Sequence, residues 1–497
     1  MIRYKKSSVA SSRGFLPLSV ALLGITLIAC SNTDTANVSF DNATFKQSIK
    51  AMGITGDPTT GRILPSINDP KPQLGKKLFF TKGLGGDSDS ACVTCHHPSL
   101  GGGDNLSLSI GVGAQTPDLL GPGRVHSMNA SGGEYDGGPT VPRNAPTTFN
   151  LVMWDQALFH DGRVESLGKT AGRNGDDQLG IRTPDSTFGT ADPDAGLTLV
   201  AAQSRFPVTS PEEMRGFSFE AGKSNTALRA ALEAKLANDW GTEFLNVFGD
   251  ASITYSRIAE AIAEYERSQV FVDNPWKSYV EGDNTAINDS AKRGAWLFFN
   301  NIENGGANCA SCHSGDFFTD EQYHVLAMPQ IGRGKGNDND TLKNDDFGRF
   351  RETKELSDMY KFRTPSLLNV EVTGPWGHTG AYTTLDGIVR HMLNPERAIA
   401  NYDLSQLDST IQTSGMSINT QFALNQLVEN RINNVTNVHH NVLFNNGDVL
   451  DLVEFLTSLT DPCVKSRACL APWIPDASEA DPDGLRLIAI DSDGELL

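Results

Sequence analysis

Two short segments of the sequence combine a pair of thiols with an imidazole. Ala91–Leu100 reads ACVTCHHPSL and Asn308–Phe317 reads NCASCHSGDF, so the frame Cys-x-x-Cys-His occurs twice. Two thiols on a short turn reach the two vinyl groups of one porphyrin, and the adjacent histidine then lies under the iron as a ligand. The frames predict two covalently bound haem c groups, held by Cys92, Cys95 and His96 and by Cys309, Cys312 and His313.

Two other uses of paired cysteines fit less well. A thioredoxin-like redox pair belongs in a βαβ unit, which this sequence does not predict. A zinc site needs tetrahedral ligands, so two pairs that are 217 positions apart would have to meet in the fold.

The N-terminus predicts export. Residues 1–29 form a signal segment with a basic start, MIRYKK, and an apolar run, FLPLSVALLGITLIA, which Pro17 interrupts and which is short for a membrane span. The segment resembles a bacterial lipoprotein signal. That resemblance implies cleavage before Cys30, a lipid on Cys30 and, because Ser31 follows, anchoring at the periplasmic face of the outer membrane. The alternative is an ordinary signal peptide with an incidental cysteine.

Charge and the remaining cysteines add two expectations. The net charge is −19, and removal of four basic residues with the signal lowers it to −23, so nucleic acid is excluded as a partner. The acidic surface fits a basic protein partner or plain solubility equally well. In an oxidising compartment, the two cysteines left over, Cys463 and Cys469, are expected to form a disulfide.

Patterning along the chain predicts a mainly α fold. The sequence predicts helices in LGKKLFF, YSRIAEAIAEYERSQVF, AKRGAWLFF, TTLDGIVRHML and NNGDVLDLVEFL, and SPEEM opens a further one with Ser210, Pro211 and Glu213. Residues 98–142 and 168–198 are rich in Gly, Asp and Pro or Ser and predict long loops. Residues 30–61 are expected to be a polar tether, and residues 473–497 a loose acidic tail.

These segments, in this order, resemble the bacterial di-haem cytochrome c peroxidase family, including its MauG-like branch. The resemblance covers about residues 62–460 and also includes RNAPTTFN, FHDGR and FRTPSLLNVEVTGPWGHTGAY. It implies two cytochrome c-like domains packed face to face, residues 62–280 with the peroxidatic haem and residues 281–472 with the electron-transfer haem.

The resemblance assigns Glu213 in SPEEM to the peroxide site and Gln203 to a hydrogen-bond donor beside it. A carboxylate there takes a proton from one peroxide oxygen and delivers it to the leaving one. Ser210, Pro211 and Glu213 also fit a plain helix cap, and both readings can hold together. Gln203 is otherwise an ordinary polar residue at a helix end.

The resemblance also implies a sixth ligand for the second haem and a calcium ion. Met392 lies fourteen residues after His378 of PWGHTG, where a thioether would raise the iron's reduction potential. His391 is the rival ligand, and helix core is the alternative role of Met392. The calcium ligands would be Asn144, Thr373 and Pro375, whose plain alternative is turn formation.

The chain departs from the family in two places. His160 in FHDGR replaces the usual tryptophan between the haems, and it is expected either to pass electrons or to bind a haem propionate. Residues 132–142 contain no histidine to block the peroxide haem, and His126 lies further upstream, so the first haem is expected to be open. His97, His324, His439 and His440 are expected to be solvated.

Three functions follow as expectations. The first is reduction of hydrogen peroxide to water with electrons from a small redox protein, a cytochrome c or a copper protein. The second is MauG-like oxidation of residues on a partner protein through a high-valent bis-haem state, which Met392 opposes because the MauG-like branch has tyrosine there. The third is plain electron transfer. The resemblance also makes a homodimer an option.

Overall fold

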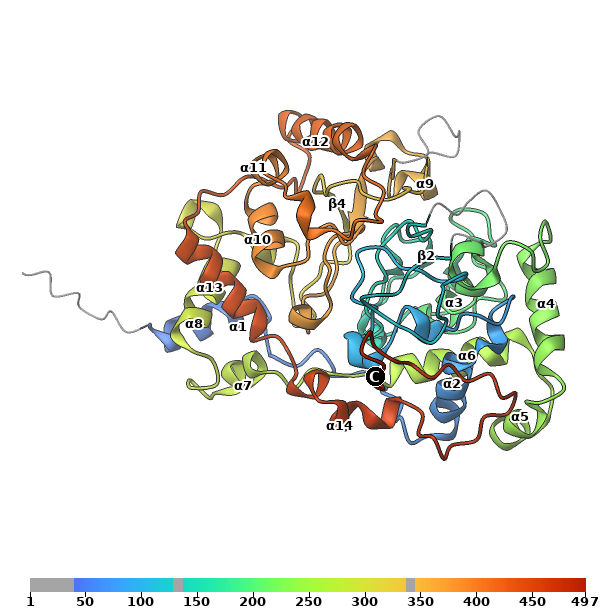
Figure 1. Cartoon of the computed structure of the whole chain (residues 1–497). Helices are drawn as coiled ribbons and strands as arrows, with labels where there is room; N and C mark the ends of the chain where they lie inside the picture. Colours follow the sequence, from blue (N-terminus) through green and yellow to red (C-terminus); the bar gives the residue numbers. More distant parts are fainter. Residues whose placement is uncertain (1–39, 128–136, 337–344) are drawn as a thin grey trace, which may run out of the picture. The chain divides into compact units, whose positions relative to one another are not determined.

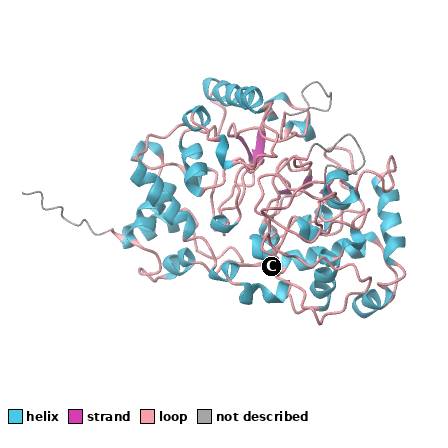
Figure 2. Cartoon of the chain, in the orientation of Figure 1, coloured by secondary structure: helices cyan, strands magenta, loops and turns pink. Residues whose placement is uncertain are grey.

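The fold is mainly helical, as the sequence predicts (Figures 1 and 2). The computed structural model describes residues 40–127, 137–336 and 345–497, and the export segment with Cys30 lies outside these ranges. Within them, no helix combines the length and the apolar character needed to cross a bilayer. The α-helices are α1 (Asn42–Ala51), α2 (Pro70–Phe80), α3 (Leu199–Gln203), α4 (Asn225–Leu236), α5 (Gly241–Phe248), α6 (Tyr255–Arg267), α7 (Pro275–Glu281), α8 (Asp289–Phe299), α9 (Phe350–Thr353), α10 (Leu385–Leu393), α11 (Pro395–Ala400), α12 (Met416–Ile432), α13 (Asn446–Thr457) and α14 (Arg467–Leu470).

Each Cys-x-x-Cys-His loop follows a helix that packs closely on a later helix. α2 packs on α6, and α8 packs on α13 (Figure 1). Glycine permits both contacts, because a Cβ on Gly75 would lie 1.9 Å from Ala261 O and a Cβ on Gly294 would lie 1.8 Å from Asp451 O. The same local design therefore supports the two motifs.

The apolar positions of these helices form two separate cores. Burial of each large apolar side chain contributes about 1.5–3 kcal/mol to folding. The core around α2 and α6 contains Leu74, Leu78, Phe79, Ile258, Ile262 and Tyr265. The core around α8 and α13 contains Ala295, Phe298, Phe299, Val449, Leu452, Phe455 and Leu456. Residues 40–497 nevertheless form one compact unit, so the division near residue 280 stays a prediction.

Five short strands complete the described chain. β1 (Ala157–Leu158), β2 (Val164–Ser166) and β3 (Ile181–Arg182) form an antiparallel sheet in that order, and β4 (Tyr323–Val325) pairs with β5 (Lys361–Arg363). The turn between β1 and β2 carries FHDGR, so the sheet holds this motif in place.

Two segments predicted to be loose are packed against the rest of the chain. α1 lies within the expected tether and buries Phe45 and Ile49 in the core around α8 and α13. In the acidic tail, Leu487 is buried and its N–H donates to Phe80 O (2.8 Å), while Asp483 accepts from Trp240 Nε1 (2.8 Å). Both expectations were wrong because a few apolar residues anchor segments whose overall composition is polar.

Cys463 and Cys469 form a disulfide with their Cα atoms 5.3 Å apart, as the sequence predicts. The bridge closes a short loop between α13 and the tail, where Val464 and Leu470 enter the core around α2 and α6. The disulfide lies directly before the acidic tail in the sequence.

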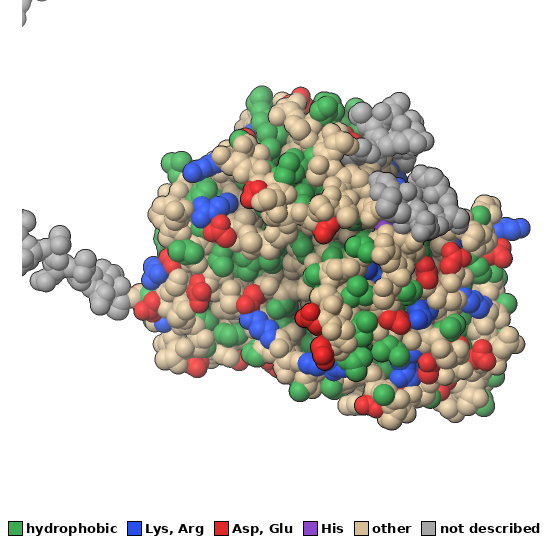
Figure 3. Space-filling model, viewed as in Figure 1, with side chains coloured by type: hydrophobic (Ala, Val, Ile, Leu, Met, Phe, Trp, Pro, Cys, Tyr) green, Lys and Arg blue, Asp and Glu red, His purple; other side chains and the backbone are tan. Residues whose placement is uncertain are grey.

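The surface carries mixed charge. On the face drawn in Figure 3, Lys and Arg side chains are scattered among Asp and Glu side chains. Some surface charges form ion pairs, as in Arg293–Asp451 and Lys277–Asp273, both at 2.7 Å. On the face shown, the excess of acidic residues is therefore spread out rather than gathered in one patch.

Candidate active site

Both Cys-x-x-Cys-His motifs open onto one cavity of about 460 Å³. Its lining comes from segments that are far apart in the sequence, and most of the lining is apolar. The cavity brings together the residues that the sequence assigns to haem binding, peroxide chemistry and calcium: Cys92, Cys95, His96, Asn144, Gln203, Glu213, Cys309, Cys312, His313, Thr373, Pro375 and Met392.

The histidine of each motif is oriented as a metal ligand. His96 Nδ1–H donates to Gly102 O (3.1 Å), and His313 Nδ1–H donates to Phe318 O (3.0 Å). Because a carbonyl oxygen only accepts, each imidazole keeps its Nε2 lone pair for an iron. Burial lowers the pKa of both histidines, so the rings stay in the neutral form that binds metal.

The four motif cysteines are not joined in disulfides. Burial raises the pKa of Cys92, Cys95 and Cys309, so these side chains are neutral thiols in the cavity wall. Thiols beside a neutral imidazole in an apolar cavity fit a covalently attached haem at each motif.

Glu213 lines the cavity from a five-residue π-helical turn, Pro211–Arg215. Ser210 Oγ accepts a hydrogen bond from Glu213 N–H (3.3 Å), so the helix cap is formed while Glu213 also lines the cavity. Burial raises the pKa of Glu213, and the positive charges of Arg163 and Lys335 oppose that rise. A half-buried carboxyl group beside cations is suited to accept and release a proton.

Gly111, in the described part of the segment after the first motif, touches the turn that carries Glu213. A Cβ on Gly111 would lie 2.3 Å from Glu213 O and 2.4 Å from Glu212 O. The backbone of the loop and the backbone of the π-helical turn therefore touch, and glycine is required at the contact. Gln203 lines the same cavity at the end of α3.

Gly111→Val is expected to push this turn away and to lower peroxide turnover per haem by about tenfold or more, since small displacements of a catalytic group have large effects. Steady-state peroxide consumption measures the change. Gly241→Ala is the matched control, because a Cβ there meets nothing closer than 3.7 Å. Wild-type turnover in Gly111→Val would contradict the expectation.

Met392 lines the cavity from α10, whereas its neighbour His391 does not. His391 Nε2–H donates to Leu326 O (2.8 Å), and its Nδ1 accepts from Tyr382 Oη (2.7 Å). Both nitrogens of the rival ligand are therefore occupied. His439 Nε2–H donates to Met392 O (2.6 Å) and holds the backbone of Met392.

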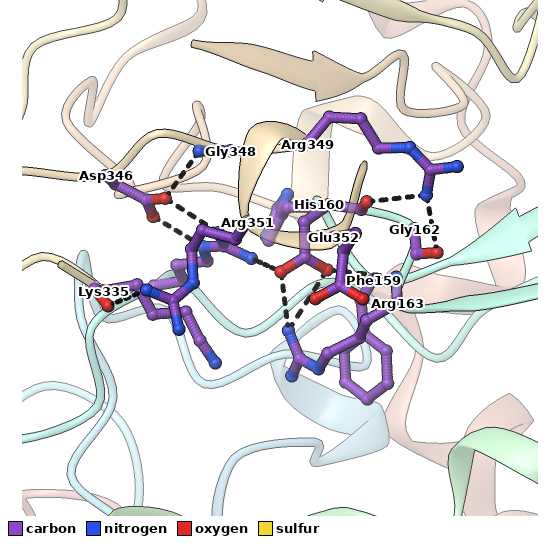
Figure 4. A network of polar contacts seen from close by, with 12 residues as sticks. Phe159, His160, Gly162, Arg163, Lys335, Asp346, Gly348, Arg349, Arg351 and Glu352 are labelled. Atoms are coloured by element: carbon purple, nitrogen blue, oxygen red, sulfur yellow. Dashed lines mark hydrogen bonds and ion pairs between the residues drawn. The ribbon is translucent and has the colours of Figure 1, made fainter. Parts of the chain in front are cut away.

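FHDGR belongs to a network of charged residues at the cavity wall (Figure 4). Arg143 donates to Asp161 (2.6 Å) and with two nitrogens to Asp346 (2.6 and 2.8 Å). His160 Nε2–H donates to Asn144 O (3.1 Å), and burial together with Arg143 lowers the pKa of His160 to about 4. His160 is therefore a neutral ring in the cavity wall.

The residues expected to hold calcium lie at the meeting point of two motifs. Asn144 N–H donates to His378 O (2.9 Å), and Asn144 Nδ2 donates to Leu106 O (2.9 Å). These bonds join RNAP to PWGHTG, and Thr373 and Pro375 line the same cavity. Amide and carbonyl oxygens are ligands that Ca²⁺ accepts.

The histidines expected to be solvated differ from one another. His97 is fully buried, so that expectation was wrong for this residue, and its Nδ1 accepts from Ser99 N–H (3.1 Å). His324 lies beside Cys312, and its Nε2 is 2.8 Å from Asp320. Burial opposes its charge, but hydrogen bonds to Asp320 and Cys312 outweigh burial and raise the pKa of His324 to about 10. Only His440 of the four is exposed.

Further cavity-lining side chains without a role assigned from the sequence include Arg163, Glu266, Lys335 and His378, and His324, His439 and His440 also line the cavity. Glu266 and His378 are buried, with no hydrogen-bond partner for Glu266 Oε2 or for either ring nitrogen of His378. Burial raises the pKa of Glu266 to about 8. His126 is also buried but is not among the described residues that line the cavity.

Comparison with known proteins agrees with this site. The family model of di-haem cytochrome c peroxidase matches residues 69–285. Methylamine utilization protein MauG of Methylorubrum extorquens is 29% identical over 334 residues, which is 66% of this chain and 71% of that protein. Cytochrome c551 peroxidase of Pseudomonas aeruginosa is 27% identical over 332 residues, with 66% and 73% covered.

Solved structures share the fold. A MauG-like protein associated with microbial copper homeostasis superposes with a TM-score of 0.51 at 19% identity, covering 85% of this chain and 96% of that one. The diheme peroxidase BthA of Burkholderia thailandensis gives a TM-score of 0.51 at 21% identity, covering 86% and 92%. The resemblance drawn from the motifs is therefore confirmed: residues 69–285 match the di-haem cytochrome c peroxidase family model, and the chain is similar both to peroxidases and to MauG.

Proposed function

We propose that this protein reduces hydrogen peroxide to water with two electrons from a small redox protein. One observation carries the proposal above the others: Glu213 and Gln203 line the same cavity as the cysteines and histidine of the first motif. A cytochrome that only transferred electrons would not need a proton-transferring group there.

The reaction consumes two protons and two electrons for each peroxide and yields two waters. Bound haem would supply the iron that receives peroxide and the electrons that break its O–O bond. Glu213 would take the proton from one peroxide oxygen and return it to the other, which leaves as water. Gln203 would orient the peroxide through its amide, and the apolar lining would exclude competing water.

At the second motif, Met392 and His313 line the same cavity and would be the protein ligands that hold the electron-transfer haem. A thioether in this position favours the reduced iron and so suits a group that stores an electron. The hydrogen bond from His439 to Met392 O supports the position of this ligand.

The test is steady-state peroxide turnover by the purified protein with a panel of reduced cytochromes c and copper proteins. Turnover that depends on donor and peroxide supports the proposal. A long-lived optical change after mixing with peroxide alone, joined to oxidation of a partner protein, would favour the MauG-like alternative. Ferric iron that is low-spin with two protein ligands at both haems would contradict an open first haem.

We also propose a calcium ion at Asn144, Thr373 and Pro375, together with export and lipid anchoring through Cys30 to a bacterial membrane. The cavity position of the three residues and the apolar segment before Cys30 support these proposals. Elemental analysis of the purified protein tests the first. Mass spectrometry of the mature N-terminus tests the second, because a diacylated cysteine is heavier than a free one.

A further inference from the structure

Arg124 is a buried arginine that donates to backbone carbonyl groups, and only 4% of it is exposed. Its Nε donates to Ile110 O (2.6 Å), and its Nη2 donates to Gly111 O (2.7 Å). Its Nη1 donates to Pro117 O (2.9 Å) and to Leu119 O (2.8 Å). All three nitrogens of the guanidinium therefore hold one loop, residues 110–119, in shape.

This loop touches the π-helical turn that carries Glu213. A Cβ on Gly111 would lie 2.3 Å from Glu213 O, and Val112 N–H donates to Glu212 O (3.3 Å). Both neighbours of the glycine in the sequence are buried, so the loop is fixed in the interior on either side of the contact. The guanidinium of Arg124 is therefore one hydrogen bond away from the residue that touches the backbone of Glu213.

The turn has a second support at the first Cys-x-x-Cys-His motif. Gly86 N–H donates to Met214 O (2.9 Å), and Met214 Sδ lies 3.9 Å from Cys92 Sγ. Met214 is itself buried, with 3% exposed. The π-helical turn is therefore held between the segment of the first motif and the loop that Arg124 organises.

We propose that Arg124 is a positioning residue for peroxide reduction: it keeps the loop at Gly111 against the π-helical turn and so fixes Glu213 relative to the first motif. The catalytic consequence rests on the proposed function, whereas the support of the turn by the loop stands without it. An arginine suits this role because its rigid planar fork donates to several carbonyl groups at once, which the single nitrogen of a lysine cannot do in the same geometry.

Loss of the guanidinium leaves the buried carbonyl groups of Ile110 and Gly111 without these donors, so the loop is expected to rearrange. The turn then loses one of its two supports. Arg124→Gln is expected to lower peroxide turnover per haem by about tenfold, because small displacements of a catalytic group have large effects. The backbone amides of the turn are expected to open more often and to exchange with solvent about tenfold faster.

Hydrogen exchange of the haem-loaded protein, followed by mass spectrometry of the peptide that covers residues 208–216, tests the support of the turn. Arg124→Gln and Arg124→Lys are both expected to show the faster exchange, and the lysine variant keeps the charge where the glutamine variant fails to take up haem. Arg486→Gln is the matched control, since Arg486 also donates to carbonyl groups, Asp476 O (2.8 Å) and Glu479 O (2.5 Å), but in the acidic tail. It is expected to keep the wild-type exchange and turnover.

Turnover in a double variant shows whether Arg124 acts through Glu213. Arg124→Gln is expected to cause little further loss when Glu213 is already glutamine, because both changes then affect the same catalytic group. Equal losses with and without the Glu213 carboxyl group would overturn the inference, as would wild-type exchange of residues 208–216 in both Arg124 variants. Faster exchange in these variants of a protein that does not reduce peroxide would uphold the support of the turn and reject the proposed function.

Discussion

Glu213→Gln is expected to lower kcat for peroxide reduction by about 10² to 10³, with little change in haem content or in the spectrum of the reduced second haem. Glutamine keeps the shape of the side chain but cannot accept and return a proton. The backbone N–H of residue 213 would still donate to Ser210 Oγ, so the π-helical turn is expected to persist. Single-turnover mixing of reduced enzyme with peroxide measures the chemical step directly.

If Glu213 acts as the base, the activity of the wild-type enzyme is also expected to depend on pH. Burial raises the pKa of Glu213 above its ordinary value, and the group acts as a base only when ionised. Activity is therefore expected to be full above that raised pKa and to be lost as the pH falls through it. Glu212→Gln is the matched control, since it removes a like charge beside Glu213 and is expected to move the acid limb downward. A wild-type kcat in Glu213→Gln would show that the carboxyl group takes no part in peroxide reduction.

Met392→His is expected to lower the reduction potential of the second haem by a few tenths of a volt, because a thioether favours ferrous iron more than an imidazole does. Donor-dependent turnover is then expected to fall at least tenfold, since the donor can no longer deliver its electron readily. Spectroelectrochemical titration measures the potential, and the methionine-to-iron charge-transfer absorption of the ferric protein is expected to disappear.

His391→Gln is the control for this assignment. Both ring nitrogens of His391 are already bonded, to Leu326 O and to Tyr382 Oη, so its loss is expected to leave the methionine absorption in place. The reverse result, with the absorption kept in Met392→His and lost in His391→Gln, would transfer the ligand role to His391.

The helices that support the haem motifs could be predicted because their signals are local. α6 and α13 show apolar residues at helical spacing behind the caps Thr254 and Asn445, and both form as expected. Among the described residues the longest helix is α12, which the sequence pattern does not predict. It buries Ala423 and Leu427 but exposes Ile418 and Ile432, so its sequence lacks a one-sided apolar pattern and its position depends on packing.

The residues of the candidate site also fall into two groups, those with a local sequence signal and those without one. Cys92, Cys95 and His96 are recognisable because haem attachment needs three groups within one short turn. Lys335 and Glu266 carry no such signal, since a lone lysine among glycines and a lone glutamate near the end of a helix have many ordinary roles. They became site residues only when the cavity could be seen.

The sequence by itself determined the chemistry that depends on neighbouring residues: two haem attachment turns, the cap that presents Glu213, and the disulfide between Cys463 and Cys469. Tertiary structure alone decided which distant groups meet. It brought Lys335 to the cavity that Glu213 lines, turned His391 away from it, and packed the acidic tail against Phe80. The physical reason is the separation of the residues along the chain. Residues within one turn are placed by their spacing in the sequence. Contacts between residues more than a hundred positions apart depend on how the hydrophobic cores pack.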